Sequence, residues 1–178
     1  MRRAKTAFRL ILAGAAVAIA GPAIAQSCVQ SADRTAFEVR ALQSQLMVAA
    51  LTCARDDDYN AFVRKFQGEL GGAYSSIQRH FRRTAGGGHQ RALDGYITTL
   101  ANEQSQDGIR QGSRFCQNVG PLFQAALSQS NASSLADISM ERNVLNPFEA
   151  PVCAERATTT ASTRARPAAR AGTAAARR

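Results

Sequence analysis

Four cysteines, spread along most of the chain, constrain its fold more than any other feature. They stand at Cys28, Cys53, Cys116 and Cys153, so that successive cysteines are 25, 63 and 37 positions apart. A zinc cluster usually draws on close pairs such as Cys-x-x-Cys, which this spacing does not contain. An even number of cysteines in an exported chain instead indicates disulfides. We therefore expect two disulfides and no free thiol in an exported form of the protein.

The N-terminus predicts that the chain is exported. Residues 1–9 carry four positive charges and no acid, and residues 10–20 form an apolar run interrupted only by one glycine. A Gly-Pro pair then breaks the run, and residues 23–25 supply the small-residue exit Ala-Ile-Ala that signal peptidase accepts. The apolar run is too short to cross about 30 Å of hydrocarbon. We expect a cleaved signal peptide over residues 1–25 and a periplasmic or secreted protein without a transmembrane anchor.

Residues 26–153 form one candidate domain whose sequence pattern is helical. Sustained alternation of polar and apolar residues, which would indicate strands, is absent. Apolar residues instead recur at helical spacing in three long stretches: one from near residue 31, one from near residue 56 to the glycines at 86–88, and one after these glycines that includes Leu93 and Leu100. We expect the third stretch to end at Gly120-Pro121 and short helices to follow it. The predicted fold is all-α: a small helical bundle of three long antiparallel helices plus short helices.

Two of the long helices carry further local predictions. In the first, apolar residues step by three and four positions, and we expect the polar residues between them to face solvent: Arg40, Gln43, Ser44 and Gln45. In the second, Gly68, Gly71 and Gly72 weaken the middle of the helix. These glycines predict either a kink or the close approach of another helix.

Helix geometry selects between the ways of pairing the cysteines. Cys28 and Cys53 flank the first helix, which at about 1.5 Å per residue holds them about 30 Å or more apart. A disulfide requires Cα atoms within roughly 7 Å of each other, so this pair is excluded. In an up-down-up arrangement the first and third helices end at the same pole, and the returning chain brings the last cysteine back to the first. We therefore predict the disulfides Cys53–Cys116 and Cys28–Cys153.

The net charge of +9 is concentrated at the two ends of the chain. The first 25 residues contribute +4, and six arginines against one glutamate contribute +5 after Cys153, which leaves residues 26–153 neutral. A neutral domain lacks the basic surface that nucleic-acid binding requires, so we expect no nucleic-acid partner. Residues 154–178 are rich in Ala, Thr and Arg without a hydrophobic stripe, and we expect them to be disordered. Their arginines favour an anionic envelope surface as partner, unless this segment is simply unconstrained.

A second basic feature surrounds three consecutive glycines at residues 86–88. Arginine side chains and exposed backbone amides suit phosphate or carboxylate groups, so the sequence offers a candidate anion-binding site here. The alternative is a helix C-terminus at which cations favour the helix dipole, followed by a loop. We call this set the arginine corner: Arg79, His80, Arg82, Arg83, His89 and Arg91.

Catalytic and metal-binding patterns are missing from the sequence. The acidic triplet at residues 56–58 lacks the glycine and the final glutamate of a calcium loop and is better explained as helix capping. Two histidines without a third ligand predict no metal site. Other carboxylates stand alone, no Gly-x-Ser-x-Gly motif occurs, and the cysteines are taken up by disulfides. We predict no catalytic residue, no metal and no cofactor.

These features favour a non-catalytic, envelope-associated binding module. Two other classes remain as alternatives. A small cell-wall-acting hydrolase would require a site that no motif reveals, such as a pair of carboxylates in a cleft. A chaperone-like periplasmic protein would require an exposed apolar groove between helices.

Overall fold

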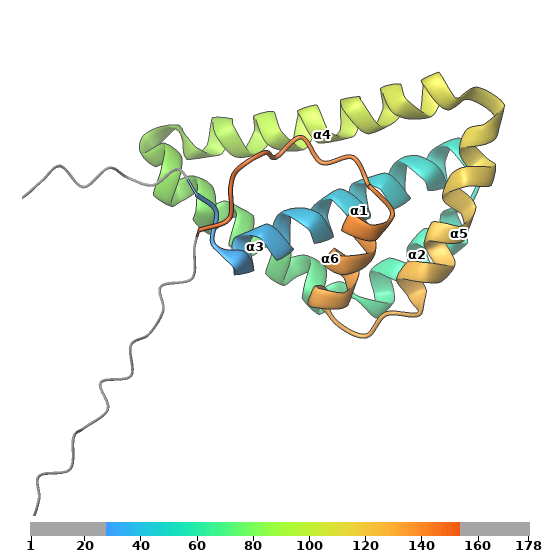
Figure 1. Cartoon of the computed structure of the whole chain (residues 1–178), viewed down its shortest axis with the longest axis horizontal. Helices are drawn as coiled ribbons and strands as arrows, with labels where there is room; N and C mark the ends of the chain where they lie inside the picture. Colours follow the sequence, from blue (N-terminus) through green and yellow to red (C-terminus); the bar gives the residue numbers. More distant parts are fainter. Residues whose placement is uncertain (1–27, 154–178) are drawn as a thin grey trace, which may run out of the picture.

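The computed structural model describes residues 28–153, which are all-α (Figure 1). The predicted signal peptide, residues 1–25, and the predicted disordered segment, residues 154–178, lie outside the described residues. The only β pairing among residues 28–153 is a single parallel bridge between Val29 and Val152. The helices follow in the order α1 (Ser31–Cys53), α2 (Asp56–Lys65), α3 (Gln67–Ala85), η1 (Gly86–Gly88), α4 (His89–Gln111), η2 (Gly112–Arg114), α5 (Phe115–Leu127) and α6 (Ala132–Glu141).

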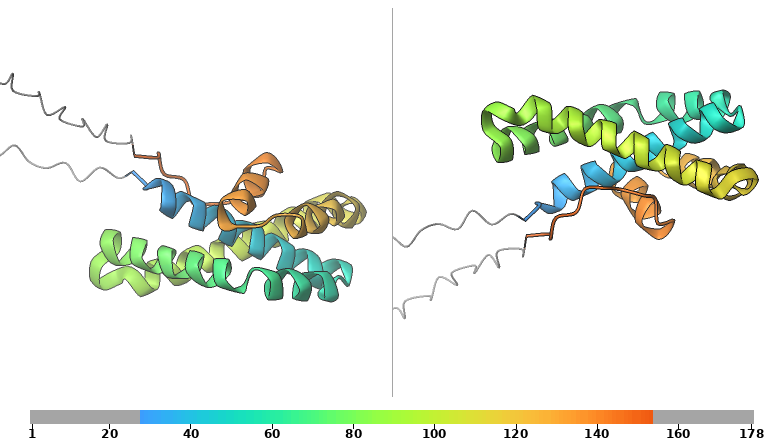
Figure 2. Two further views of the ribbon diagram at one scale, coloured as in Figure 1. Left: turned by 90° about the horizontal axis from the view of Figure 1, so that it is seen from below. Right: turned by 90° about the horizontal axis from the view of Figure 1, so that it is seen from above.

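Helix α1 lies at the centre of the fold. Thirteen of its 23 residues are buried, which is more than one face of a helix can supply. Helices α3 and α4 cover one side of α1, and α6 covers the other (Figure 2). The expectation that Ser44 and Gln45 face solvent is therefore wrong, because both are buried, whereas Arg40 and Gln43 are half-buried.

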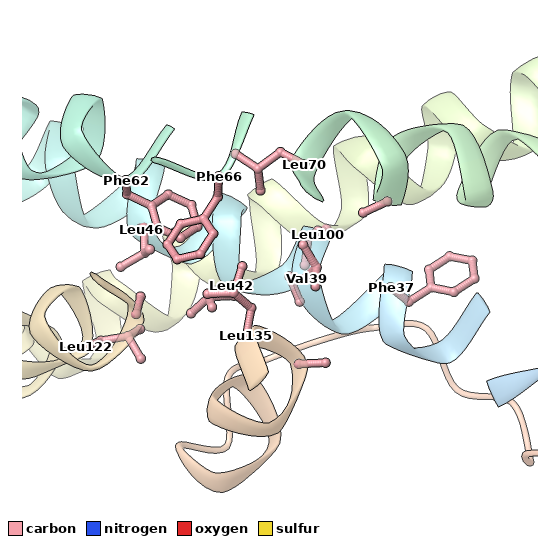
Figure 3. Packing of buried hydrophobic residues seen from close by; sticks show 14 of the residues in the cluster. Phe37, Val39, Leu42, Leu46, Phe62, Phe66, Leu70, Leu100, Leu122 and Leu135 are labelled. Carbon is pink, nitrogen blue, oxygen red and sulfur yellow. The ribbon is translucent and has the colours of Figure 1, made fainter. Parts of the chain in front are cut away.

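Large apolar side chains from several helices meet around α1 (Figure 3). Leu42 and Leu46 of α1 are fully buried, as are Phe62 of α2 and Leu135 of α6. Burial of such side chains stabilises the fold by roughly 1.5–3 kcal/mol each relative to exposure. The core thus joins segments that lie far apart in the sequence.

Both predicted disulfides are confirmed. Cys53 at the end of α1 is bonded to Cys116 in α5, with Cα atoms 5.6 Å apart, and Cys28 is bonded to Cys153, with Cα atoms 4.8 Å apart. No cysteine is free. Beside the second disulfide, the Val29 amide donates to the Pro151 carbonyl and the Cys153 amide donates to the Val29 carbonyl, both at 2.8 Å. We call this joined pair of ends, residues 28–29 and 151–153, the clasp.

The second long stretch is interrupted at Phe66, which separates α2 from α3. The Phe66 ring is buried in the core beside Phe62. A Cβ built on Gly68, Gly71 or Gly72 would meet no atom within 4 Å. These glycines therefore do not mark a close helix contact, and the interruption falls just before them.

The third stretch ends earlier than the sequence predicts. Gly112 ends α4 with a φ of +56°, a backbone conformation that glycine adopts without strain. Gly120-Pro121, the predicted end, instead lies inside α5. Burial of Leu122 and Phe123 in the core offsets the backbone hydrogen bond that Pro121 cannot make.

Residues 142–153, which we call the return segment, lead from α6 back to the N-terminal end of α1 (Figure 1). Gln104 of α4 is fully buried, and its Nε2 donates to the carbonyls of Ala41 and Leu145, at 3.0 and 2.8 Å. Farther along, the Phe148 ring stacks on Phe37 of α1 with ring centroids 3.5 Å apart. The return segment is thus held against the core before it reaches the clasp.

No helix among residues 28–153 is long and apolar enough to cross a membrane.

Tyr96 of α4 provides a test of this packing at alkaline pH. Burial raises the pKa of Tyr96 far above its usual range, although Arg40 lowers it in part. Because an unfolded tyrosine ionises near pH 10 and folded Tyr96 does not, stability should fall as the pH rises above about 10. Absorbance at 295 nm, which reports ionised tyrosine, can be followed as the pH is raised. As long as the helical circular-dichroism signal persists, the curves for the wild type and Tyr96→Phe should superimpose. In denaturant they should differ by one tyrosine; a difference in the folded state would contradict the burial.

Candidate anion-binding site

The arginine corner lies where α3 ends, η1 turns the chain and α4 begins (Figure 1). The apolar residues Leu70 and Ile77 of α3 are buried, which turns the arginines of its last turns toward solvent. Arg79, Arg82 and Arg83 are exposed on α3, and Arg91 is exposed on α4. The four arginines that the sequence placed in one set therefore do surround a single hairpin.

His80 does not belong to the exposed part of the corner. It is only 7% exposed, and its ring makes edge contacts with Phe37, Phe81 and Phe148. Its Nδ1 lies 3.2 Å from Oδ2 of Asp33. Asp33 is buried too. His80 thus packs in the interior and cannot meet a ligand at the surface of this corner.

Asp33 is the residue that sequence reasoning missed. It lies in the first turn of α1, and the same Oδ2 that faces His80 also accepts a hydrogen bond from Arg83 Nη2. Acids in the first turn of a helix are common because they favour the helix dipole, so nothing in the sequence indicates a partner 47 positions away. Asp33 neutralises part of the corner and fixes α3 against the start of α1.

The remaining corner residues differ in how far their polar groups are engaged. His89 Nδ1 lies 2.8 Å from the Gly86 carbonyl oxygen, so this nitrogen must be the donor. Arg79 donates to the Ser76 hydroxyl at 2.7 Å. Arg82 and Arg91 make no ion pair with any of residues 28–153. Arg91 and the exposed acid Asp94 line the same shallow hollow. The exposed corner is therefore Arg79, Arg82 and Arg91, with Asp94 opposing them.

The clasp lies at the same end of the molecule as the arginine corner (Figure 1). Val29, in the clasp, is four residues from Asp33, and Asp33 contacts both His80 and Arg83. Cys153, the last described residue, therefore lies at the same end of the fold as the arginine corner. Sequence alone gave no reason to connect these two features.

Elsewhere among residues 28–153, three carboxylates have side-chain partners: Glu38, Asp58 and Asp107. Glu38 of α1 is buried, accepts a hydrogen bond from Ser139 at 3.1 Å and lies 3.6 Å from Arg34. Asp107 accepts hydrogen bonds from Arg110 and Gln111. Among residues 28–153, no three His, Cys, Asp or Glu side chains are grouped so as to hold a metal ion.

No protein-family model, curated protein or solved structure matches this chain. The roles proposed below consequently rest on the charge, burial and geometry of the chain itself. In those terms, the exposed corner offers arginine donors to an anion but no enclosing pocket. This arrangement suits an extended anionic surface better than a single small ligand.

Proposed function

We propose that this protein is a non-catalytic binding module of the cell envelope, exported to an oxidising compartment and attached to an anionic surface through residues 154–178. The observation that supports the proposal is that the clasp lies at the same end of the fold as the arginine corner, where Asp33 contacts His80 and Arg83. Two disulfides in a chain with a predicted signal peptide support export. The domain itself needs no charge of its own for this role, because the basic segment supplies it.

The charges of the two basic features act in the same direction. Residues 156–178 contain six arginines and no acid. Each cation near an anionic membrane contributes roughly 1 kcal/mol, and salt weakens the attraction. The exposed corner, at the same end of the fold as Cys153, adds to the same field. Binding should therefore depend mainly on the segment and secondarily on the corner.

Co-sedimentation with phosphatidylglycerol-containing vesicles tests the proposal on the protein comprising residues 26–178. Deleting residues 156–178 should weaken binding about tenfold or more at low salt, because six cations are removed. The combined change Arg79→Gln, Arg82→Gln and Arg91→Gln should weaken it several-fold. The triple variant should keep the helical signal and melting temperature, since Arg79, Arg82 and Arg91 are exposed and make no ion pair within residues 28–153. The deletion should keep them too, because the sequence of residues 156–178 has no hydrophobic stripe.

A matched control replaces all six arginines after Glu155 by glutamine and keeps the length of the segment. It should behave like the deletion if charge is responsible. Equal binding by the wild type and the deletion variant would overturn the proposed role of the segment. Absence of binding by all forms would overturn the attachment to an anionic surface.

One observation favours the hydrolase alternative. Glu38 and Glu149 line the same cavity of about 730 Å³, between the start of α1, the end of α6 and the return segment. Two carboxylates in a cleft are the minimum for acid and base roles in glycoside hydrolysis. Incubation with isolated cell-wall material separates the classes in the same assay. A binding module should accumulate in the pellet, and a hydrolase should release soluble sugar fragments that Glu38→Gln abolishes.

A further inference from the structure

A second cavity, remote from the arginine corner, lies between α1, α4, α5 and the start of the return segment. Its volume is about 510 Å³, within the range of roughly 300–1,000 Å³ that is usual for small-molecule sites. Its apolar lining comes mainly from α5 and the return segment: Phe115, Val119, Leu122, Val144 and Leu145. The polar lining is rich in amide side chains: Gln45, Gln111, Asn118 and Asn143.

Gln45 is the most informative of these side chains. It is only 8% exposed, it lines the cavity, and no hydrogen bond joins its side chain to any of residues 28–153. A primary amide offers two donor hydrogens and an acceptor oxygen, and those of Gln45 are open to the cavity that the side chain lines. The helix that carries Gln45 is otherwise packed on both sides. A ligand in the cavity that carries an amide or a carboxyl group would satisfy the Gln45 side chain.

The charges that line the cavity select an anion. Arg142, just after α6, is exposed at the cavity and has no ion pair with any described residue. Asp107 also lines the cavity, but its two oxygens already accept hydrogen bonds from Arg110 and Gln111. The polar side chains of the lining without a partner among residues 28–153 thus include the Gln45 and Asn143 amides and the Arg142 guanidinium. A guanidinium binds a carboxylate through two parallel hydrogen bonds.

We propose that this cavity binds an acylated amino-acid carboxylate, either a free N-acyl amino acid or the C-terminal residue of a peptide. Arg142 takes the carboxylate, Gln45 takes the adjacent amide, and a branched aliphatic side chain lies against Val119 and Leu122. This site goes beyond the proposed surface attachment. It uses neither the arginine corner nor residues 154–178, so the two proposals can fail separately.

Calorimetric titration of the protein comprising residues 26–178 provides the test. The probes are N-acetyl-leucine, as both stereoisomers, its carboxamide N-acetyl-leucinamide, and the tripeptide N-acetyl-Ala-Ala-Leu. We expect saturable binding of the carboxylates and binding about tenfold weaker, or more, for the carboxamide. Tighter binding of the tripeptide than of N-acetyl-leucine would identify a peptide end as the natural source, and the reverse order a free acyl amino acid.

Variants connect this binding to the named residues. Arg142→Gln should weaken the carboxylates about tenfold and leave the carboxamide unchanged. Gln45→Leu should weaken all probes about tenfold, because it removes the amide while keeping the side-chain volume. Two control variants outside the cavity, Arg64→Gln on α2 and Gln124→Leu on α5, should bind as the wild type does.

Three results would overturn the proposal: no saturable binding of any carboxylate probe, equal binding of N-acetyl-leucine and its carboxamide, or wild-type binding by both variants. Should Gln45→Leu fail to fold, the exposed Arg142→Gln variant decides alone through its selective effect on the carboxylates.

Discussion

Replacing Cys28 and Cys153 by serine together is expected to lower the free energy of unfolding by about 4 kcal/mol. The disulfide joins residues 125 positions apart, and closing so long a loop removes much entropy from the unfolded chain. Its loss also frees the clasp, whose two backbone hydrogen bonds hold Val29 against the return segment. Guanidinium denaturation under non-reducing conditions measures the loss. Hydrogen exchange should speed up most at the amides of Val29 and Cys153.

The other disulfide provides the comparison. Cys53 and Cys116 are 63 positions apart, and halving a loop reduces the closure entropy by only about 0.6 kcal/mol. The variant with serine at both positions should therefore lose nearly as much stability, while the clasp amides remain protected. If this second variant also exposed the clasp amides, the two ends of the fold would unfold together rather than separately.

Leu135→Ala is expected to lower the free energy of unfolding by about 2–5 kcal/mol, through lost burial and the cavity left behind. Leu135 is fully buried on α6, the helix that covers the side of α1 opposite α3. Neither disulfide attaches α6 directly, so its packing on α1 depends on side chains such as this one. Chemical denaturation measures the effect.

Leu51→Ala is the matched control, because Leu51 on α1 is 75% exposed. The same chemical change there should shift stability by no more than about 0.5 kcal/mol. Similar losses in the two variants would mean that α6 does not pack on α1 as described.

The sequence was sufficient for the features that depend on spacing along one helix. The apolar steps through Leu42 and Leu46 located α1, and the length of α1 excluded a bond between Cys28 and Cys53. The remaining pairing then followed from the direction of the chain. These inferences succeed because helix rise and disulfide reach are fixed lengths.

Predictions from the sequence were wrong where contacts with distant segments determine burial or the end of a helix. Ser44 and Gln45 have the polarity of a solvated face, and packing of α1 against segments distant in the sequence buries them. Gly120-Pro121 has the local signature of a helix end, which burial of the neighbouring Phe123 overrides. No spacing pattern in the sequence indicates that Asp33 pairs with His80.

The clasp also determines how the domain carries mechanical load. The chain enters the described fold at Cys28 and leaves it at Cys153, and one covalent bond connects these two points. Tension applied between the segments before and after the domain therefore passes through the sulfur–sulfur bond and bypasses every helix. A protein held to a surface by residues after Cys153 and pulled from the other end would keep its core intact under force. Only reduction of this disulfide would route the force through α1 and the return segment.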